Sequence, residues 1–312
     1  MGHNKIEIHK VRRGLHMPSR FPPWMHRKLP SGGKMAATVE TLKQYGLNTI
    51  CRSALCPNQG ECLAGGTATF LILGDRCTRN CTFCAVSKGA PLPPDPDEPE
   101  KLAQAVAAMK LRHVVITSVT RDDLPDGGAG HFAATLRALH RSVPAATTEV
   151  LTPDFCGQEQ AIDTVITAGP DVYNHNVETV ARLYGMVRPK AKYSRSLDLL
   201  RYVKEKAPGI YTKSGLMVGL GEEFGEVVAV LQDLRAAGCD VLTIGQYLQP
   251  SPHHLPVKRF VTPEEFTAYK ERAIQLGFVH VESGPFVRSS YRAHELWNTA
   301  LHRTFQRRDG KV

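Results

Sequence analysis

The residues of this chain that are most able to do chemistry are its cysteines. The chain has 312 residues and eight cysteines, six of which lie between Cys51 and Cys84. They form two groups of three, one in CRSALCPNQGEC at 51–62 and one in DRCTRNCTFCAVSKG at 75–89. In a chain without a secretory signal, such clustering is typical of metal binding rather than of a disulfide framework. We therefore expect the clustered cysteines to bind metal.

The second group has the spacing C-x3-C-x2-C, formed by Cys77, Cys81 and Cys84. Three thiolates on one loop can hold three corners of a 4Fe–4S cube and leave the fourth iron open to a substrate or cofactor. Structural zinc sites usually present four closed ligands, commonly as paired C-x2-C knuckles, which this spacing does not match well. The spacing favours iron–sulfur chemistry, with zinc as the alternative.

The elements that must position these cysteines are predicted by a regular alternation of strands and helices. Short apolar runs predict strands at 67–74, 113–119, 148–152, 171–174, 211–218 and 240–246. Amphipathic segments predict helices at 98–110, 130–141, 158–168, 194–206, 222–237 and 263–276, with a short helix at 37–45 ahead of the first cysteines. Alternating strands and helices form a parallel sheet that right-handed crossovers can curl into a barrel. Eight repeats would need more chain, so we expect a partial (β/α)6 barrel with ligands at the carboxyl ends of its strands.

The charge distribution argues against a nucleic-acid partner, and the hydropathy argues against a membrane-spanning segment. The formal net charge is +9, but residues 1–36 carry eight Lys and Arg against one acid and residues 299–312 carry four against one. A nucleic-acid enzyme more often spreads basic residues over a groove, whereas basic ends suit either an acidic partner protein or solubilising tails. No apolar run approaches the roughly 20 residues of a membrane span. We expect a soluble, cytoplasmic protein with no nucleic-acid or membrane partner.

The second cysteine group, with Phe83 as its aromatic residue, resembles the motif of the radical S-adenosylmethionine superfamily. The segment GLMVGLGE at 215–222 is similar to the pattern that supports the adenine of the cofactor in that superfamily. By itself this glycine pattern is also compatible with a simple strand-to-helix turn. The resemblance implies that the open iron binds the amino and carboxylate groups of S-adenosylmethionine, whose reductive cleavage yields a 5′-deoxyadenosyl radical.

The first cysteine group, Cys51, Cys56 and Cys62 in C-x4-C-x5-C spacing, resembles lipoyl synthases within that superfamily. The similarity continues through TATFLILGDRCTRNCTFCAVSKG, ITSVTRDDLPDGGAGHF, NHNVETV, LMVGLGE, IGQYLQPS and GPFVRSSYRA, over about residues 25–295. It implies radical insertion of sulfur at carbons 6 and 8 of a protein-bound octanoyl-lysine, with an auxiliary 4Fe–4S cluster as the sulfur donor. The implied cofactors are two 4Fe–4S clusters and S-adenosylmethionine, with no catalytic residue beyond the cluster ligands.

The same resemblance implies the partners of the reaction. They are octanoylated carriers, namely the glycine cleavage H protein and the lipoyl domains of 2-oxoacid dehydrogenases, together with an iron–sulfur carrier protein and an electron donor such as flavodoxin or ferredoxin. Two alternatives are a biotin synthase-like or methylthiolating radical enzyme and a zinc-stapled module that binds nucleic acid through its basic ends. The first cysteine group and the terminal RSSY sequence argue against the former.

Candidate contacts to the cofactor are polar residues at expected strand ends, joined by two residues of the resembled motifs. Acids and amides in such loops also cap helices or fix turns, which is the alternative for each. Arg188 is the candidate partner of the cofactor carboxylate. The full set is Phe83, Thr120, Asp122, Asn176, Glu178, Arg188 and Met217.

The fourth ligand of the auxiliary cluster is assigned through the resemblance to the RSSY sequence at 288–291, where Ser290 is preferred to Ser289. The alternative is that both serines cap a helix beginning near Tyr291. Cys156 and Cys239 stand alone and are expected to be buried structural thiols. The expected organisation is an N-terminal extension at 1–66, the barrel at 67–284 and a C-terminal extension at 285–312.

Overall fold

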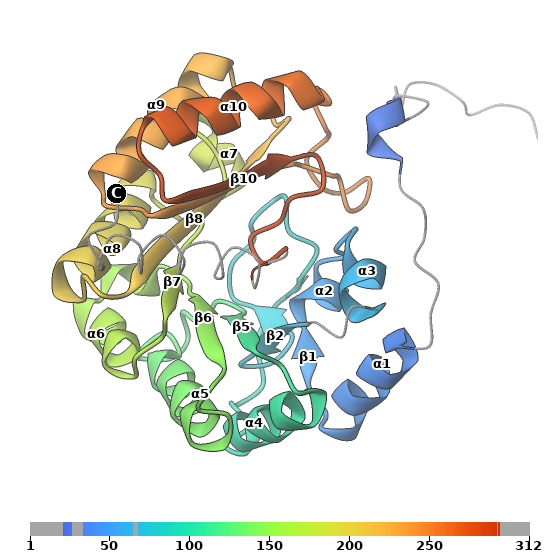
Figure 1. The fold of residues 1–312 in the computed structure, drawn as a ribbon, viewed down its shortest axis with the longest axis vertical. Helices are drawn as coiled ribbons and strands as arrows, with labels where there is room; N and C mark the ends of the chain where they lie inside the picture. The colour runs from blue at the N-terminus through green and yellow to red at the C-terminus, as the bar shows by residue number, and fades with distance from the viewer. Residues whose placement is uncertain (1–20, 27–33, 65–67, 292, 294–312) are drawn as a thin grey trace, which may run out of the picture.

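A curved, open sheet with helices on its outer face organises the chain (Figure 1). The structure is a computed structural model that describes residues 21–26, 34–64, 68–291 and 293. Within these residues the main sheet has eight strands in the order β1-β2-β5-β6-β7-β8-β9-β10. Its parallel strands are β2 (Thr69–Ile72), β5 (His113–Ser118), β6 (Thr147–Leu151), β7 (Val172–Asn174), β8 (Tyr211–Val218), β9 (Val241–Gln246) and β10 (His280–Gly284).

The two edges of the sheet differ from each other. Strand β1 (Asn48–Thr49) pairs antiparallel with β2, and β10 pairs in parallel with β9. In the described part of the chain β1 and β10 do not pair, so the barrel is open. The predicted partial barrel is thus confirmed, with β10 as a further parallel strand beyond the six predicted. Two short strands, β3 (Arg76–Cys77) and β4 (Ser87–Lys88), form a separate small sheet.

The helices that follow the strands pack their apolar faces onto the sheet. Their buried side chains and the strand residues form one continuous hydrophobic core. The main helices that follow the strands are α4 (Glu98–Met109), α5 (Ala129–Ser142), α6 (Glu159–Thr167), α8 (Tyr193–Lys206), α9 (Phe224–Ala236) and α10 (Pro263–Gln275). The other helical segments are η1 (Pro23–Met25), α1 (Lys34–Gln44), α2 (Ile50–Ser53), α3 (Gln59–Ala64), η2 (Phe155–Gly157), η3 (Ala181–Leu183) and α7 (Tyr184–Val187).

Local chemistry explains where α10 begins. Pro263 occupies the first turn, where its missing N–H costs no helical hydrogen bond. The Thr262 side chain accepts a hydrogen bond from the Glu265 N–H, and the Glu265 side chain accepts one from the Thr262 N–H. This reciprocal capping box satisfies two backbone donors that would otherwise lack partners. The sequence TPEE is therefore a sufficient start signal for the predicted helix at 263–276.

The interior of the barrel contains a buried ion pair between strands β6 and β8. The Lys213 ammonium lies 2.8 and 2.9 Å from the two carboxylate oxygens of Glu149, and both side chains are only 2% exposed. The Asn174 amide donates to the same carboxylate at 2.9 Å. Burial alone would raise the pKa of Glu149, but Lys213 and His113, whose Nε2 atom lies 3.6 Å from the carboxylate, together outweigh it and lower the pKa to about 2.

Replacing Lys213 with methionine is expected to lower the free energy of unfolding by about 3–5 kcal/mol, because Glu149 would remain buried without its cation. The wild-type contribution of Glu149 should be complete above pH 4.5, its unfolded pKa, and should be lost as the pH falls toward 2. Urea denaturation between pH 3 and pH 7 measures both effects. Lys270→Met, which removes the exposed partner of Glu282, is the control and should cost less than about 1 kcal/mol. Equal losses in the two variants would contradict the prediction.

No helix in the described ranges is both long and apolar enough to cross a membrane.

Strand β10 ends at Gly284, the last residue of the barrel domain predicted from the sequence. Strand β1, which belongs to the predicted N-terminal extension, nevertheless joins the barrel sheet. The division into extensions and a barrel stays a prediction.

Candidate active site

The second cysteine triplet lies in the loop that follows β2, at the carboxyl edge of the parallel sheet. Strands β3 and β4 pair to close the base of this loop. The Cys77 sulfur accepts hydrogen bonds from the backbone N–H groups of Arg79 and Thr120, each at 3.4 Å. The Cys84 N–H donates to the Cys81 carbonyl at 3.3 Å. Donors directed at sulfur offset the negative charge that a metal-bound thiolate carries.

Burial controls the acidity of these thiols. It raises the pKa of Cys84 to about 12, and it raises the pKa of Cys81 although the nearby charge of Arg188 opposes it. A thiolate at either position therefore needs a cation bound beside it, which iron supplies.

All eight cysteines lie in the described ranges, and none forms a disulfide. In the same ranges no group of three or more His, Cys, Asp or Glu side chains is arranged around a single metal ion. Three reduced thiols on one loop fit a cluster.

The first cysteine triplet lies on α2, on α3 and on the turn between them, against the amino end of β2. The Cys56 N–H donates to the Cys51 carbonyl at 3.0 Å, and the Cys62 N–H donates to the Asn58 carbonyl at 2.9 Å. Burial raises the pKa of Cys51, whereas hydrogen bonds from Thr69, the first residue of β2, lower it. The two triplets thus lie at opposite ends of a strand that spans about 10 Å, at roughly 3.3 Å per residue.

The segment after β10 turns into the middle of the ring and returns to the first triplet (Figure 1). Asn58 donates through its side-chain amide to the Phe286 carbonyl at 2.7 Å, and the Tyr291 hydroxyl donates to the Glu61 carboxylate at 2.9 Å. The segment also crosses β9 closely: a Cβ atom on Gly245 would lie 2.1 Å from the Val287 carbonyl oxygen. Only glycine permits this approach, so Gly245 is a requirement of the crossing.

Ser290 lies beside Thr69, the first residue of β2, which is close to the first cysteine triplet. Its hydroxyl oxygen accepts a 2.7 Å hydrogen bond from the Thr69 hydroxyl. The Thr69 backbone and hydroxyl also lie close enough to the Cys51 thiol to lower its pKa. The fold therefore brings the serine preferred as a cluster ligand and the first cysteine to the same threonine, across most of the chain length.

Ser289, unlike Ser290, is hydrogen-bonded to two asparagines. Its oxygen accepts a 2.8 Å hydrogen bond from the Asn174 amide, and its hydroxyl donates to the Asn176 side-chain oxygen at 3.1 Å. The Asn174 amide is in turn held by Glu149. Both the lone pair and the proton of Ser289 are therefore engaged with protein groups.

Four of the candidate cofactor contacts meet beside Cys81. Asn176 donates to the Glu178 carboxylate at 3.1 Å, Arg188 donates to the Asn176 carbonyl at 2.9 Å, and the Met217 N–H donates to the Glu178 carbonyl at 2.8 Å. Burial raises the pKa of Glu178, although Arg188 opposes it. Glu178 has a φ of 67°, a conformation that costs energy for any residue but glycine and is concentrated at functional sites.

Of these four residues, Arg188 is the best suited to bind an anion. Its guanidinium is almost fully buried, and its Nε atom has no hydrogen-bond partner within the described residues. One terminal nitrogen donates to the Tyr184 hydroxyl at 3.1 Å. A buried cation with an unused donor favours a bound carboxylate, because leaving that donor unpaired is costly.

The three remaining candidates surround the second triplet. Phe83 is partly buried and packs against the hydrophobic core. Thr120 donates through its N–H to the Cys77 sulfur. Both carboxylate oxygens of Asp122 already accept hydrogen bonds from Arg79, at 2.8 and 2.9 Å. Asp122 therefore follows β5, with both of its carboxylate oxygens engaged by protein groups, and its contact with the cofactor stays a prediction.

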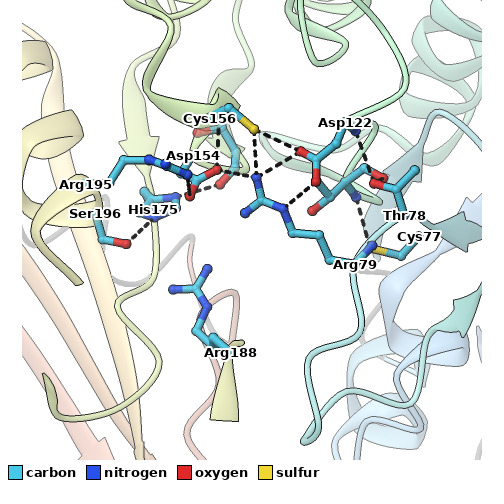
Figure 2. Close-up of polar contacts among 12 residues, drawn as sticks. Cys77, Thr78, Arg79, Asp122, Asp154, Cys156, His175, Arg188, Arg195 and Ser196 are labelled. Carbon is cyan, nitrogen blue, oxygen red and sulfur yellow. Dashed lines mark hydrogen bonds and ion pairs between the residues drawn. The ribbon is translucent and has the colours of Figure 1, made fainter. Parts of the chain in front are cut away.

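Figure 2 shows an ion-pair network that sequence reasoning missed. Arg79 pairs with Asp122 and also donates to Asp154 at 2.6 Å. Asp154 is fully buried and pairs on its other oxygen with Arg195 at 3.3 Å. Burial alone would raise the pKa of Asp154, but Arg79 outweighs it and lowers the pKa to about 2. The available signals were an arginine between two cluster cysteines and acids just after two predicted strands.

One of the two isolated cysteines departs from its prediction. Cys239 is fully buried in the core, as expected. Cys156 is exposed, so its prediction as a buried thiol is wrong. It lies on η2 at the carboxyl edge of the sheet, with a left-handed φ of 53°, and its thiol donates to Asp122 at 3.4 Å. The Cys156 side chain therefore lies in a polar loop at this edge of the sheet and not in the core.

Known proteins resemble this chain in sequence and in fold. The model of the radical SAM superfamily matches residues 71–245, and solved radical SAM structures share the fold. SuiB of Streptococcus suis bound to S-adenosylmethionine aligns with a TM-score of 0.54 at 12% identity, over 73% of this chain and 55% of that one. HydG, a maturase of the [FeFe]-hydrogenase, aligns with a TM-score of 0.52 at 12% identity, over 85% and 74%. The chain is a radical SAM protein.

Curated relatives narrow the class to one family. A lipoyl synthase of Rubrobacter xylanophilus is 57% identical over 274 residues, which cover 88% of this chain and 85% of the relative. A lipoyl synthase of Caldanaerobacter subterraneus is 58% identical over 279 residues, which cover 89% and 97%. The chain belongs to the lipoyl synthase family. It is therefore an enzyme, and the alternative of a zinc-stapled binding module is wrong.

Proposed function

We propose that this enzyme replaces one C–H bond at carbon 6 and one at carbon 8 of a protein-bound octanoyl-lysine with C–S bonds. The observation that carries the proposal is the placement of two cysteine triplets at opposite ends of β2. An extended acyl chain between two such sites would face a hydrogen-abstracting centre on one side and a sulfur source on the other. Membership of the lipoyl synthase family supports this assignment of the two sites.

The carboxyl edge of the sheet would hold the radical-generating cofactor. Cys77, Cys81 and Cys84 would bind a 4Fe–4S cluster, which with S-adenosylmethionine supplies the hydrogen-abstracting radical chemistry when bound. Arg188 would pair with the cofactor carboxylate through its unused Nε donor. The other proposed contacts surround the same loop and are Phe83, Thr120, Asp122, Asn176, Glu178 and Met217.

The amino end of β2 would hold the sulfur source, which we treat as a substrate of the reaction. Cys51, Cys56 and Cys62 would bind three irons of an auxiliary 4Fe–4S cluster. Ser290 is supported as the fourth ligand because Thr69 donates a hydrogen bond to it and also lies close enough to Cys51 to lower the pKa of that thiol. The enzyme would therefore carry two clusters with separate jobs.

The reaction implies partners of stated chemistry. The octanoyl group would be presented by carrier domains such as the glycine cleavage H protein and the lipoyl domains of 2-oxoacid dehydrogenases. A flavodoxin or ferredoxin would donate electrons, and an iron–sulfur carrier would replace the consumed cluster. We expect this reaction to take place in the cytoplasm.

Anaerobic turnover with an octanoyl-lysine peptide tests the proposal directly. The reconstituted enzyme is supplied with S-adenosylmethionine and a chemical reductant, and the peptide is examined by mass spectrometry. Two added sulfur atoms per peptide are expected. A peptide that is unchanged while the cofactor is cleaved on adding it would contradict the proposed substrate.

Changing Cys56 to alanine should separate the two sites. Cleavage of S-adenosylmethionine should continue near the wild-type rate, because the second triplet is intact, while sulfur insertion should fall by at least about 100-fold, since even an outer-shell change costs roughly 10–100-fold at a metal site. Cys239→Ala, a core cysteine outside both triplets, is the control and should retain both activities. Sulfur insertion by Cys56→Ala at the rate of this control would rule out the first triplet as the source.

A further inference from the structure

Arg79 lies between two cysteines of the second triplet and ties their loop to two neighbouring loops (Figure 2). Its side chain is only 4% exposed. The guanidinium forms a two-pronged pair with Asp122 at 2.8 and 2.9 Å, after β5, and a third bond to Asp154 at 2.6 Å, after β6. A planar fork can make all three bonds at once, which the single ammonium of lysine cannot reproduce. We call this set the Arg79 clamp.

The clamp joins the loop after β2 to the loop after β5, and each of these two loops presents one N–H donor to the Cys77 sulfur. Thr78 donates through its N–H and its hydroxyl to the Thr120 carbonyl, at 3.1 and 3.0 Å. The Asp122 N–H donates back to the Thr78 hydroxyl at 3.1 Å. This docking puts the Thr120 N–H at 3.4 Å from the Cys77 sulfur, and the Arg79 N–H lies at the same distance within the loop.

Together with Arg195, which pairs with the other carboxylate oxygen of Asp154, the clamp contributes little net charge to the site. Arg79 and Arg195 supply two positive charges, and Asp122 and Asp154 supply two negative charges. Buried ion pairs of this kind are weak evidence for stability, because desolvation offsets most of their attraction. What the clamp does supply is position, since it joins the loops after β2, β5 and β6. Its influence on a bound cluster would therefore act through the backbone donors on Cys77.

We propose that Arg79 is a positioning residue that sets the reduction potential of the radical SAM cluster by holding the Cys77 sulfur against the N–H groups of Arg79 and Thr120. Reduction adds negative charge to the cluster, and hydrogen bonds to sulfur stabilise that charge. Loosening the clamp therefore lowers the potential. The inference rests on ligation of the cluster by the second triplet but not on the proposed sulfur insertion.

The test uses full-length protein in which Cys51, Cys56 and Cys62 are all replaced by alanine, so that only the radical SAM cluster is measured. Arg79→Lys keeps the charge and removes the fork. An EPR-monitored redox titration should show reduction about tenfold less favourable, which for a one-electron couple is about 59 mV. Asp122→Glu, which keeps the charge and displaces the carboxylate that receives the fork, should shift the potential in the same direction by a smaller amount.

Asp240→Asn is the matched control, because Asp240 is a buried carboxylate paired with Lys204 at 2.8 Å at the amino end of β9. It should lower the melting temperature and leave the potential unchanged. Iron content shows whether each variant holds its cluster, and Asp122→Glu decides the question if Arg79→Lys does not. A wild-type potential in the loaded clamp variants, or an equal shift in Asp240→Asn, overturns the proposal. Because no sulfur insertion is measured, failure of the proposed function would leave this result standing.

Discussion

Replacing Cys81 with alanine should abolish the reductive cleavage of S-adenosylmethionine. Three thiolates on one loop are needed to leave a single iron open, and loss of Cys81 leaves a second iron without a protein ligand. Burial disfavours the Cys81 thiolate and Arg188 favours it, so the position suits an anion bound to metal. The rate should fall by at least about 100-fold, because outer-shell changes alone cost roughly 10–100-fold at metal sites.

The measurement is release of 5′-deoxyadenosine by anaerobically reconstituted enzyme, together with iron content per chain. Cys239→Ala again controls for loss of a thiol, since Cys239 is buried far along the chain from both triplets. Cleavage at a near wild-type rate by Cys81→Ala would show that the C-x3-C-x2-C loop does not hold the cluster.

The predicted strands and helices were confirmed where one pattern dominated the segment. The strand predicted at 211–218 matches β8, because its residues are almost continuously buried, as a strand covered on both faces requires. Strand β10 was missed because its sequence HVESG has one apolar residue and a terminal glycine. Its pairing depends on β9 as a neighbour rather than on its own pattern. Strand β1 has two residues, too few for any periodicity.

The candidate site was predictable only where its residues are close in sequence. The spacing of Cys77, Cys81 and Cys84 is local, so it could be recognised without a structure. The Arg79 clamp depends on the loops after β5 and β6 meeting at one edge of the sheet, which no local spacing encodes. The exposure of Cys156 could not be inferred either, because it follows from a left-handed turn.

The two serines of the RSSY sequence have different surroundings, and these argue for different roles. Ser289 donates its proton to Asn176 and accepts from Asn174, so ligation by its oxygen would break the hydrogen bond that it donates and compete with the one that it accepts. Ser290 accepts one hydrogen bond from Thr69, on the side of the first triplet. Ser290 is therefore better suited to lose its proton to a bound metal, and Ser289 is better suited to anchor the segment.

Replacing Ser290 with alanine should reduce sulfur insertion by at least about 100-fold and leave cofactor cleavage intact, because one iron of the auxiliary cluster loses its ligand. Ser290→Cys should restore the iron content but not the rate. A soft thiolate binds iron more firmly than a hard alkoxide that protonation can release. Ser289→Ala, which removes only the anchor, should cost less than Ser290→Ala. Product mass and iron content together measure these effects. If Ser290→Ala inserted both sulfur atoms at the wild-type rate, or if Ser289→Ala were the more damaging change, Ser290 would not be the ligand.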